Sequence, residues 1–261
     1  MVTAGIDCGS KNTKVVLLEK DNILSIASVL SGFDQEESAE KALNNALDIA
    51  GINRKDIEHI TVTGAGMDAI KFANTNITII TADARGTYFI FPSARTIIDI
   101  GAEEGRVVKI DEQGKVKDFG INEKCAAGAG AFIEAMARAL EVDIESMGEL
   151  SLKSTKQIPM NAQCTIFAES EVVSLIHQKT SKEDIIRAVH DAIADRNTSM
   201  LRQIGIGQPV ALIGGMAKNI GFVDAMQRNL GFDLLIPTDI VTPEYVSALG
   251  AALIAQEKME G

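Results

Sequence analysis

Residues 2–18, Val2-Thr-Ala-Gly-Ile-Asp-Cys-Gly-Ser-Lys-Asn-Thr-Lys-Val-Val-Leu-Leu18, decide the fold that we expect for this chain. The apolar run Val2–Asp7 predicts a short buried strand, Cys8–Lys14 predicts a polar turn, and Val15–Leu18 predicts a second strand. A Walker loop would continue from its glycines into a helix. This turn leads back into a strand, so the segment predicts a hairpin with a glycine-containing turn.

The same arrangement returns in the second half of the chain. Arg95–Asp99 predicts a strand that ends, like the first one, at an aspartate followed two residues later by glycine. Two further strands are predicted after it, as two are after Asp7. Repetition of this kind indicates an internal duplication, and each copy reads as a three-stranded meander followed by α/β crossovers. We therefore expect an α/β fold of two similar subdomains around a cleft.

The remaining elements follow from hydrophobic spacing and turn residues. Further strands are predicted at Ile23–Leu30, Ile57–Thr63, Ile77–Ile80, Arg106–Ile110, Val116–Ile121, Val210–Ile213 and Phe232–Ile236. Helices are predicted at Glu36–Ala50, Ala82–Phe91, Ala131–Leu140, Cys164–His177, Lys182–Ile204, Gly221–Asn229 and Glu244–Glu257. We expect one subdomain in residues 1–93 and a second in 94–243, with the terminal helix, 244–258, packing back on the first.

Composition limits the partners that the chain can have. The 261 residues are 46% hydrophobic and carry a formal net charge of −11, which disfavours binding to nucleic acid or to an anionic membrane. No apolar run approaches the length of a membrane span, and Asp7 interrupts the first one. Three cysteines do not form a disulfide framework. We expect an acidic protein of the cytoplasm.

Three glycine turns follow predicted strands and suit a nucleoside triphosphate. Glycines let backbone N–H groups approach phosphate oxygens, and the carboxylates of Asp7 and Asp99 suit a hydrated Mg²⁺. The third turn, 214–219, suits close approach of a base and ribose. The candidate phosphate ligands are Gly9, Ser10, Lys14, Gly101 and Ala102, and the candidate adenosine contacts are Gly214, Gly215 and Asn219.

A fourth turn, Asn122-Glu-Lys-Cys-Ala-Ala-Gly-Ala-Gly-Ala-Phe132, opens with a cysteine before a predicted helix. Such a position favours thiolate and also lets backbone N–H groups reach an anion, so Cys125 is a candidate metal ligand and Gly128 and Gly130 are candidate nucleotide contacts. Cys164 is the second candidate ligand. Taken without any resemblance to known proteins, both cysteines are better explained as core thiols, because free cysteine is often buried. We expect Cys8 to be a core residue, and the three histidines share no ligand spacing.

These turns together resemble the ATPase superfamily of actin, sugar kinases and heat-shock chaperones. Residues 5–10 (GIDCGS) look like its first phosphate motif, 99–101 (DIG) its second, 213–219 (IGGMAKN) its adenosine motif, and 248–252 (ALGAA) its connecting helix. Residues 122–130 and 164–172 (CTIFAESEV) narrow the match. They are similar to the signatures of 2-hydroxyacyl-CoA dehydratase activators, a family that includes the ATPase subunits of benzoyl-CoA reductase.

The resemblance implies an ATPase that gives low-potential electrons to a partner dehydratase or reductase. Each protomer of such a dimer supplies two cysteines to one shared [4Fe–4S] cluster, and Cys125 and Cys164 fall on those positions. The dimer could be a homodimer or a heterodimer with a paralogous ATPase subunit. ATP or ADP with Mg²⁺ is the expected ligand, ferredoxin or flavodoxin the expected electron donor, and an anaerobe's cytoplasm the expected location.

Two departures from the family pattern leave alternatives open. Activators usually have Gly and then Gln-Asp after their Asp-Ile-Gly, whereas this chain has Ala102-Glu-Glu-Gly-Arg106, a pattern closer to one benzoyl-CoA reductase subunit type. Lys11 stands where activators tend to have Thr. A small-molecule kinase on the same scaffold and a nucleotide-binding regulatory subunit are the alternative functions, and a structural zinc is the alternative for the cysteines.

Overall fold

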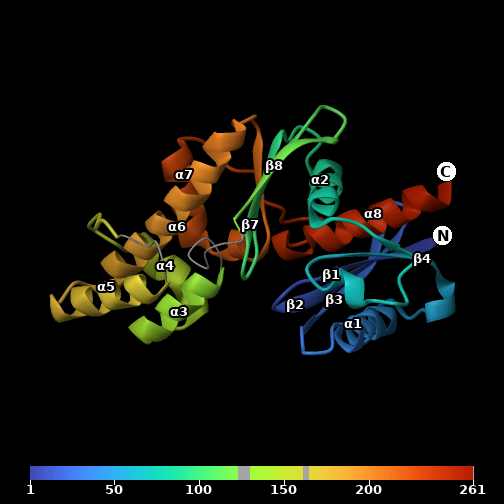
Figure 1. Cartoon of the computed structure of the whole chain (residues 1–261), viewed down its shortest axis with the longest axis horizontal. Helices are drawn as coiled ribbons and strands as arrows, with labels where there is room; N and C mark the ends of the chain where they lie inside the picture. The colour runs from blue at the N-terminus through green and yellow to red at the C-terminus, as the bar shows by residue number, and fades with distance from the viewer. Residues whose placement is uncertain (123–129, 161–164, 261) are drawn as a thin grey trace.

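The computed structural model describes residues 1–122, 130–160 and 165–260, which form two mixed sheets (Figure 1). The first sheet has the strand order β3-β2-β1-β4-β5 and the second the order β8-β7-β6-β9. The strands of the first sheet are β1 (Val2–Cys8), β2 (Asn12–Glu19), β3 (Asn22–Leu30), β4 (Ile57–Thr63) and β5 (Thr75–Asn76). Those of the second are β6 (Thr96–Ile100), β7 (Gly105–Ile110), β8 (Val116–Asn122) and β9 (Val210–Ile213).

The two sheets repeat one topology. In each, the first three strands form an antiparallel meander, and the next strand along the chain pairs in parallel with the first strand of that meander. Parallel pairing requires a crossover connection. Helix α1 (Gln35–Ala50) supplies it between β3 and β4, and a group of helices supplies it between β8 and β9. The predicted duplicated α/β architecture is therefore confirmed.

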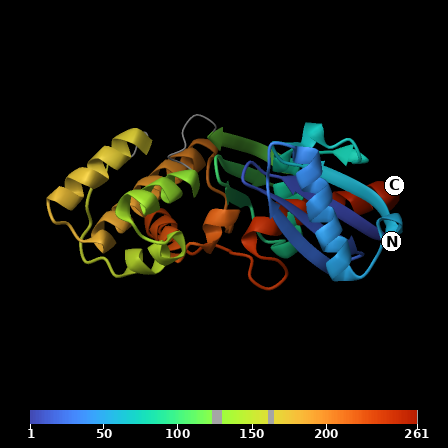
Figure 2. The same cartoon turned by 90° about the horizontal axis from the view of Figure 1, so that it is seen from below.

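Helices cover the outer faces of the sheets and also lie between them. Figure 2 shows α1 on one face of the first sheet and α8 on the other, while α2 lies against both α8 and the second sheet. The helices α3 to α7 pack together at the far side of the second sheet. Their bounds are α1 (Gln35–Ala50), α2 (Ile79–Ile90), α3 (Gly130–Leu140), α4 (Met147–Leu152), α5 (Thr165–His177), α6 (Lys182–Ile204), α7 (Ile220–Leu230) and α8 (Val246–Glu260).

Close backbone packing holds α8 in its place. A Cβ atom at Gly250 would overlap the carbonyl oxygen of Ala82 on α2, and one at Gly5 would overlap that of Ala248. On the side of the first sheet, the hydroxyl of Thr3 donates a hydrogen bond of 3.0 Å to the carbonyl oxygen of Ala252. Helix α8 thus contacts a helix on one side and a strand on the other, which explains why it is apolar over most of its circumference.

Two predicted strands differ in the structure. The segment Ile77–Ile80 is not a strand, because the Thr78 side chain accepts a hydrogen bond from the amide of Thr81 and begins α2 at Ile79. In Phe232–Ile236, only Leu235 pairs, through one parallel bridge to Ala211. Pro237 follows directly and has no amide with which to extend the pairing.

Two boundaries also differ, and one of them bears on the site. Strand β2 begins at Asn12, so the predicted turn is shorter and Lys14 lies on the strand. The last helix begins at Val246, after a 3-10 turn at Pro243–Tyr245.

Cys8 is fully buried, as predicted for a core residue, and burial raises the pKa of its thiol to about 12, with the charge of Asp7 adding to the effect. Within the described ranges, no helix combines the length and apolar character that crossing a membrane needs.

Candidate functional site

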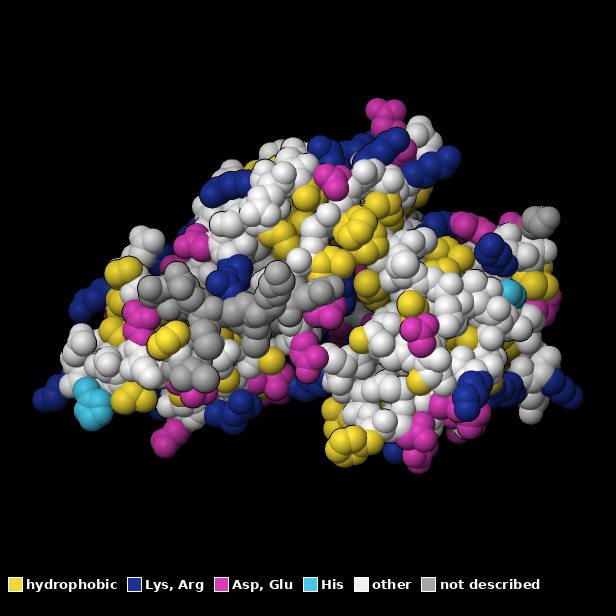
Figure 3. Space-filling model, viewed as in Figure 1, with side chains coloured by type: hydrophobic (Ala, Val, Ile, Leu, Met, Phe, Trp, Pro, Cys, Tyr) yellow, Lys and Arg dark blue, Asp and Glu magenta, His cyan; other side chains and the backbone are white. Residues whose placement is uncertain are grey.

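A cleft of about 740 Å³ lies between the two sheets, and Figure 3 shows the surface hollowed there. Its volume lies in the range of small-molecule and cofactor sites. Eleven of the predicted site residues line it: Asp7, Gly9, Ser10, Lys14, Asp99, Gly101, Ala102, Gly130, Gly214, Gly215 and Asn219. The other three, Cys125, Gly128 and Cys164, lie outside the described residues.

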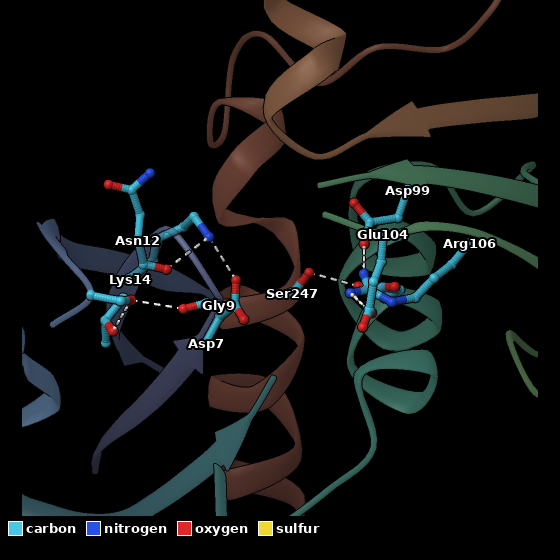
Figure 4. A network of polar contacts seen from close by, with 11 residues as sticks. Asp7, Gly9, Asn12, Lys14, Asp99, Glu104, Arg106 and Ser247 are labelled. Carbon is cyan, nitrogen blue, oxygen red and sulfur yellow. Dashed lines mark hydrogen bonds and ion pairs between the residues drawn. The ribbon is translucent and has the colours of Figure 1, made fainter. Parts of the chain in front are cut away.

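Each sheet contributes one buried ion pair to the cleft, and the two pairs occupy equivalent places. In the first sheet, Asp7 on β1 is opposite Lys14 on β2, and Lys14 Nζ lies 2.8 Å from Asp7 Oδ2. In the second, Asp99 on β6 is opposite Arg106 on β7, and the guanidinium contacts Asp99 Oδ2. The duplication has therefore placed an aspartate and a cation at the same register position in both halves (Figure 4).

A glycine at the end of the parallel strand adjoins each aspartate. Gly64 follows β4 and Gly214 follows β9, with φ of +91° and +83° respectively. A Cβ atom at Gly64 would lie 2.6 Å from Asp7 Oδ1, and one at Gly214 would overlap Asp99 Oδ1. Glycine is needed at both positions because of the left-handed backbone and because the carboxylate occupies the space of a side chain.

Burial and mutual charge set the protonation of these pairs. Burial lowers the pKa of Lys14, but the carboxylates around it, Asp7 foremost, together outweigh burial, and the net shift is upward. The pKa of Arg106 is also raised, because the carboxylates around it, Asp99 foremost, outweigh the effect of burial. Burial raises the pKa of Asp99, and the Arg106 guanidinium opposes that rise. Both cations thus stay charged beside their aspartates.

A buried carboxyl group lies beneath the two pairs. Asp83 on α2 is fully buried, and its Oδ1 accepts a hydrogen bond of 2.6 Å from Ser247 Oγ on α8. Burial raises the pKa of Asp83 well above its usual range, and the nearby charge of Asp99 adds to this. Figure 4 shows Ser247 between the Asp7–Lys14 pair and the Asp99–Arg106 pair, so the start of α8 lies between the two halves of the cleft lining.

Carboxyl groups outnumber cations in the described lining of the cleft, eight against four. Each of the four cations contacts a carboxylate: Lys11 with Glu134, Lys14 with Asp7, Arg106 with Asp99 and Glu104, and Lys218 with Glu244. A bare polyphosphate would meet an excess of negative charge here. A divalent cation bound with the polyphosphate would meet carboxylates that suit it.

Asn219 lines the cleft, but its side chain also serves the fold. Its Oδ1 accepts hydrogen bonds of 3.1 Å from the amides of Gly221 and Phe222, so it caps the N-terminus of α7. Its Nδ2 lies 3.1 Å from Nε2 of His190, which is fully buried. Burial lowers the pKa of His190 to about 3, with the charge of Arg228 contributing. The histidine is therefore neutral and orients the asparagine amide.

The sequence interpretation misses residues whose placement depends on tertiary structure. It marks Arg106 only as a departure from a family pattern, and it does not assign Glu104, Glu134 or Glu244 to the site. The strand register could have indicated Arg106, because seven residues separate it from Asp99 as seven separate Lys14 from Asp7. The contact between Lys11 and Glu134 spans 123 positions and has no local signal.

Two strand-end carboxylates, two buried cations and several glycine turns around one cleft fit a nucleoside polyphosphate with a divalent cation. Backbone N–H groups in the turns and the two cations can bind phosphate oxygens, and Asp7 and Asp99 can hold the metal through its waters. The described lining thus suits phosphoryl transfer by positioning and electrostatics.

Known proteins share this arrangement over nearly the whole chain. The chain is 38% identical over 257 residues to the activator of lactoyl-CoA dehydratase of Anaerotignum propionicum, with 98% of each chain covered. It is 30% identical over 260 residues to a subunit of the benzoyl-CoA reductase of Thauera aromatica, covering 97% of this chain and 92% of that protein.

A solved structure agrees equally closely. The activator of the 2-hydroxyisocaproyl-CoA dehydratase from Clostridium difficile, with bound ADPNP, superposes with a TM-score of 0.94 at 36% identity, covering 100% of this chain and 96% of that one. The resemblance inferred from the sequence motifs is confirmed. The profile of the BadF/BadG/BcrA/BcrD ATPase family matches residues 4–255, and the chain belongs to that family.

Proposed function

We propose that this protein is an ATP-driven activator that delivers low-potential electrons to a partner acyl-CoA dehydratase or to an enzyme of the benzoyl-CoA reductase type. The observation that carries the proposal is the cleft with its duplicated aspartate and cation pairs, in a chain of an ATPase family whose relatives activate such enzymes. A small-molecule kinase would need an acceptor pocket, and the relatives named above favour the activator instead.

In this proposal the described residues divide the work of nucleotide binding. Lys14 and the backbone of Gly9, Ser10, Gly101 and Ala102 bind phosphates, while Asp7 and Asp99 hold Mg²⁺ through its waters. The base and ribose lie along the turn that contains Gly214, Gly215 and Asn219. Support comes from the shared cleft that these residues line. No side chain acts as a covalent nucleophile, because positioning and charge are enough for phosphoryl transfer to water.

The proposed electron carrier is a [4Fe–4S] cluster bound by Cys125 and Cys164. Both cysteines lie outside the described residues, so the support is the family motif around each. A Cys₄ cluster requires four thiolates, and two such cysteines per chain require a dimer, either of identical chains or with a paralogous ATPase subunit. The cluster would supply one low-potential electron at a time. A ferredoxin or flavodoxin in an anaerobe's cytoplasm would reduce the cluster again after each electron transfer.

Coupling between the cleft and the cluster is proposed to run through α3, the helix that follows the Cys125 segment. The amide of Gly130 donates a hydrogen bond of 2.9 Å to the carbonyl of Gly101, and the amide of Ala131 donates one of 2.7 Å to that of Ala102. We call the turns after β1 and β6, residues 9–11 and 101–104, the two proposed phosphate turns. One helical turn after Gly130, Glu134 contacts Lys11 of the first of them. The start of α3 therefore contacts both phosphate turns, which makes it the element through which closure of residues 1–93 on 94–243 would act.

Replacing either cysteine tests the proposal directly. Cys125→Ala and Cys164→Ala should each abolish the [4Fe–4S] absorption and electron paramagnetic resonance signals of anaerobically reconstituted protein, because each removes two of four thiolates from the dimer. Cys8→Ala is the matched control, since its buried thiol stays protonated. A full cluster signal in Cys125→Ala would show that the ligand assignment is wrong. Zinc bound to the wild-type protein would favour a structural metal site over the [4Fe–4S] cluster. ATP binding without hydrolysis would favour a nucleotide-binding regulatory subunit over an ATPase.

A further inference from the structure

We propose that Arg106 binds the terminal phosphates of the nucleotide from the second half of the protein, as the counterpart of Lys14 in the first. The inference rests on the proposed nucleotide function of the cleft and adds a binding residue to it. The two cations would clamp the phosphate chain from opposite sides. The sequence marks residues 102–106 only as a departure from the family pattern, whereas the structure places Arg106 in the lining of the cleft beside Asp99.

The two halves of the site are arranged alike. Lys14 and Arg106 each lie on the second strand of a meander, directly opposite the aspartate that ends the first strand. Their side chains are similarly sheltered, with 16% of Lys14 and 12% of Arg106 exposed, and both line the cleft. A ligand that lies between the two aspartates therefore meets one cation from each sheet. Figure 4 shows the two groups on opposite sides of Ser247.

Arg106 also has more N–H donors than its contacts with Asp99 and Glu104 use. A guanidinium has five N–H donors in a fixed planar fork. In the described structure, Nη1 contacts Asp99 Oδ2 and Nη2 lies 2.9 Å from Glu104 Oε2, so each of these two terminal nitrogens keeps a second N–H. The two carboxylates fix the plane of the fork and leave other N–H groups available. Arg106 can thus bind phosphate oxygens without releasing Asp99.

The residue type gives a second reason. Arg106 contacts two carboxylates, Asp99 and Glu104, which hold its guanidinium in place, and a divalent cation bound with the phosphates would offset their negative charge. Planar, bidentate recognition of phosphate is the task for which arginine is better suited than lysine. The turn at 214–219, to which the proposed function assigns the base and ribose, lines the same cleft as Arg106. A cation beside Asp99 would then face the phosphate end of the nucleotide.

Calorimetric titration of three nucleotides into the Mg²⁺-loaded protein tests the inference. Arg106→Gln should weaken ATP and ADP about 10- to 100-fold, the effect of losing one or two hydrogen bonds to a charged group, and should change AMP affinity by less than about threefold. Arg106→Lys should recover only part of the loss, because lysine keeps the charge but not the fork. Arg228→Gln is the matched control, since Arg228 also bridges two carboxylates, Asp191 and Asp224, and lies outside the cleft.

The outcomes separate this inference from the proposed function. A wild-type protein that binds none of the three nucleotides overturns both. A second outcome overturns only the inference. In it the wild type binds nucleotide, and the Arg106→Gln variant, folded by circular dichroism, keeps the full preference for ATP and ADP over AMP. Arg106 would then serve only to neutralise Asp99. If Arg106→Gln does not fold, Arg106→Lys decides: unchanged affinity for all three nucleotides contradicts the phosphate contact.

Discussion

Asp7→Asn is expected to lower the rate of ATP hydrolysis about 100- to 1000-fold, the usual loss when one preorganised electrostatic group is removed from an active site. The substitution keeps the shape of the side chain and removes its charge. Asp7 is almost fully buried and its Oδ2 lies 2.8 Å from Lys14 Nζ, so its charge is only weakly screened by salt and acts at full strength on its neighbours. Asp7 holds Lys14 by an ion pair, and in the proposed function it also holds Mg²⁺, so both roles depend on its charge.

The control for this prediction is Asp224→Asn. Asp224 also forms a 2.7 Å ion pair, with Arg228, but it lies outside the cleft, so its loss should leave the hydrolysis rate near that of the wild type. Release of phosphate from ATP under saturating Mg²⁺ measures both variants, and circular dichroism checks that each is folded. Hydrolysis by Asp7→Asn at the wild-type rate would remove Asp7 from the proposed catalytic site.

Gly250→Ala is expected to destabilise the protein, although helix propensity alone predicts the opposite. Replacing glycine by alanine inside a helix normally stabilises it by about 1 kcal/mol. Here the added Cβ would overlap the carbonyl oxygen of Ala82 and would lie 2.9 Å from the amide nitrogen of Gly86, both backbone atoms of α2. Forcing the helices apart should cost about 2 to 3 kcal/mol, which lowers the Tm by roughly 4 to 12 °C for a chain of this size.

The comparison for this variant is Gly32→Ala. A Cβ atom at Gly32 would lie 3.6 Å from Ser38 Oγ, an ordinary contact, so this substitution should be close to neutral. Thermal unfolding followed by circular dichroism measures both. A Gly250→Ala protein that melts above the wild type would show that α2 and α8 are not packed backbone to backbone. Since α8 joins the first sheet to the floor of the cleft, such a result would also remove the structural link between the halves.

Local signals in the sequence were enough to predict the duplication. Asp7 and Asp99 each end an apolar strand and are followed by a glycine turn, a pattern that needs no tertiary information. Two strand predictions were wrong, each at a segment where a single neighbouring residue decided the outcome. Thr78 begins a helix by capping it, and Leu235 pairs at one residue because a proline follows. In both segments the apolar run fits either structure, so periodicity cannot choose between them.

The site was predictable in its residue types but not in its pairings. Glycine turns after strands indicated phosphate binding, and those that the structure describes line one cleft. The partner of Asp99 has a signal only through the repeat: Arg106 follows Asp99 by seven positions, as Lys14 follows Asp7, while the pairing itself depends on strand register. The contact of Lys11 with Glu134 depends on how the two halves meet. Long-range contacts of this kind decide how the two phosphate turns adjoin α3.

Coupling between the nucleotide cleft and the proposed [4Fe–4S] cluster is tested most directly by the spectrum of that cluster. The reconstituted, dithionite-reduced wild-type protein should be titrated anaerobically with Mg²⁺-ATP while its electron paramagnetic resonance spectrum is recorded. We predict a saturable change in that spectrum at the nucleotide concentration at which calorimetry shows binding, since α3 contacts both phosphate turns. A protein that binds ATP and carries a full cluster, yet shows the same spectrum with and without ATP, would contradict the account.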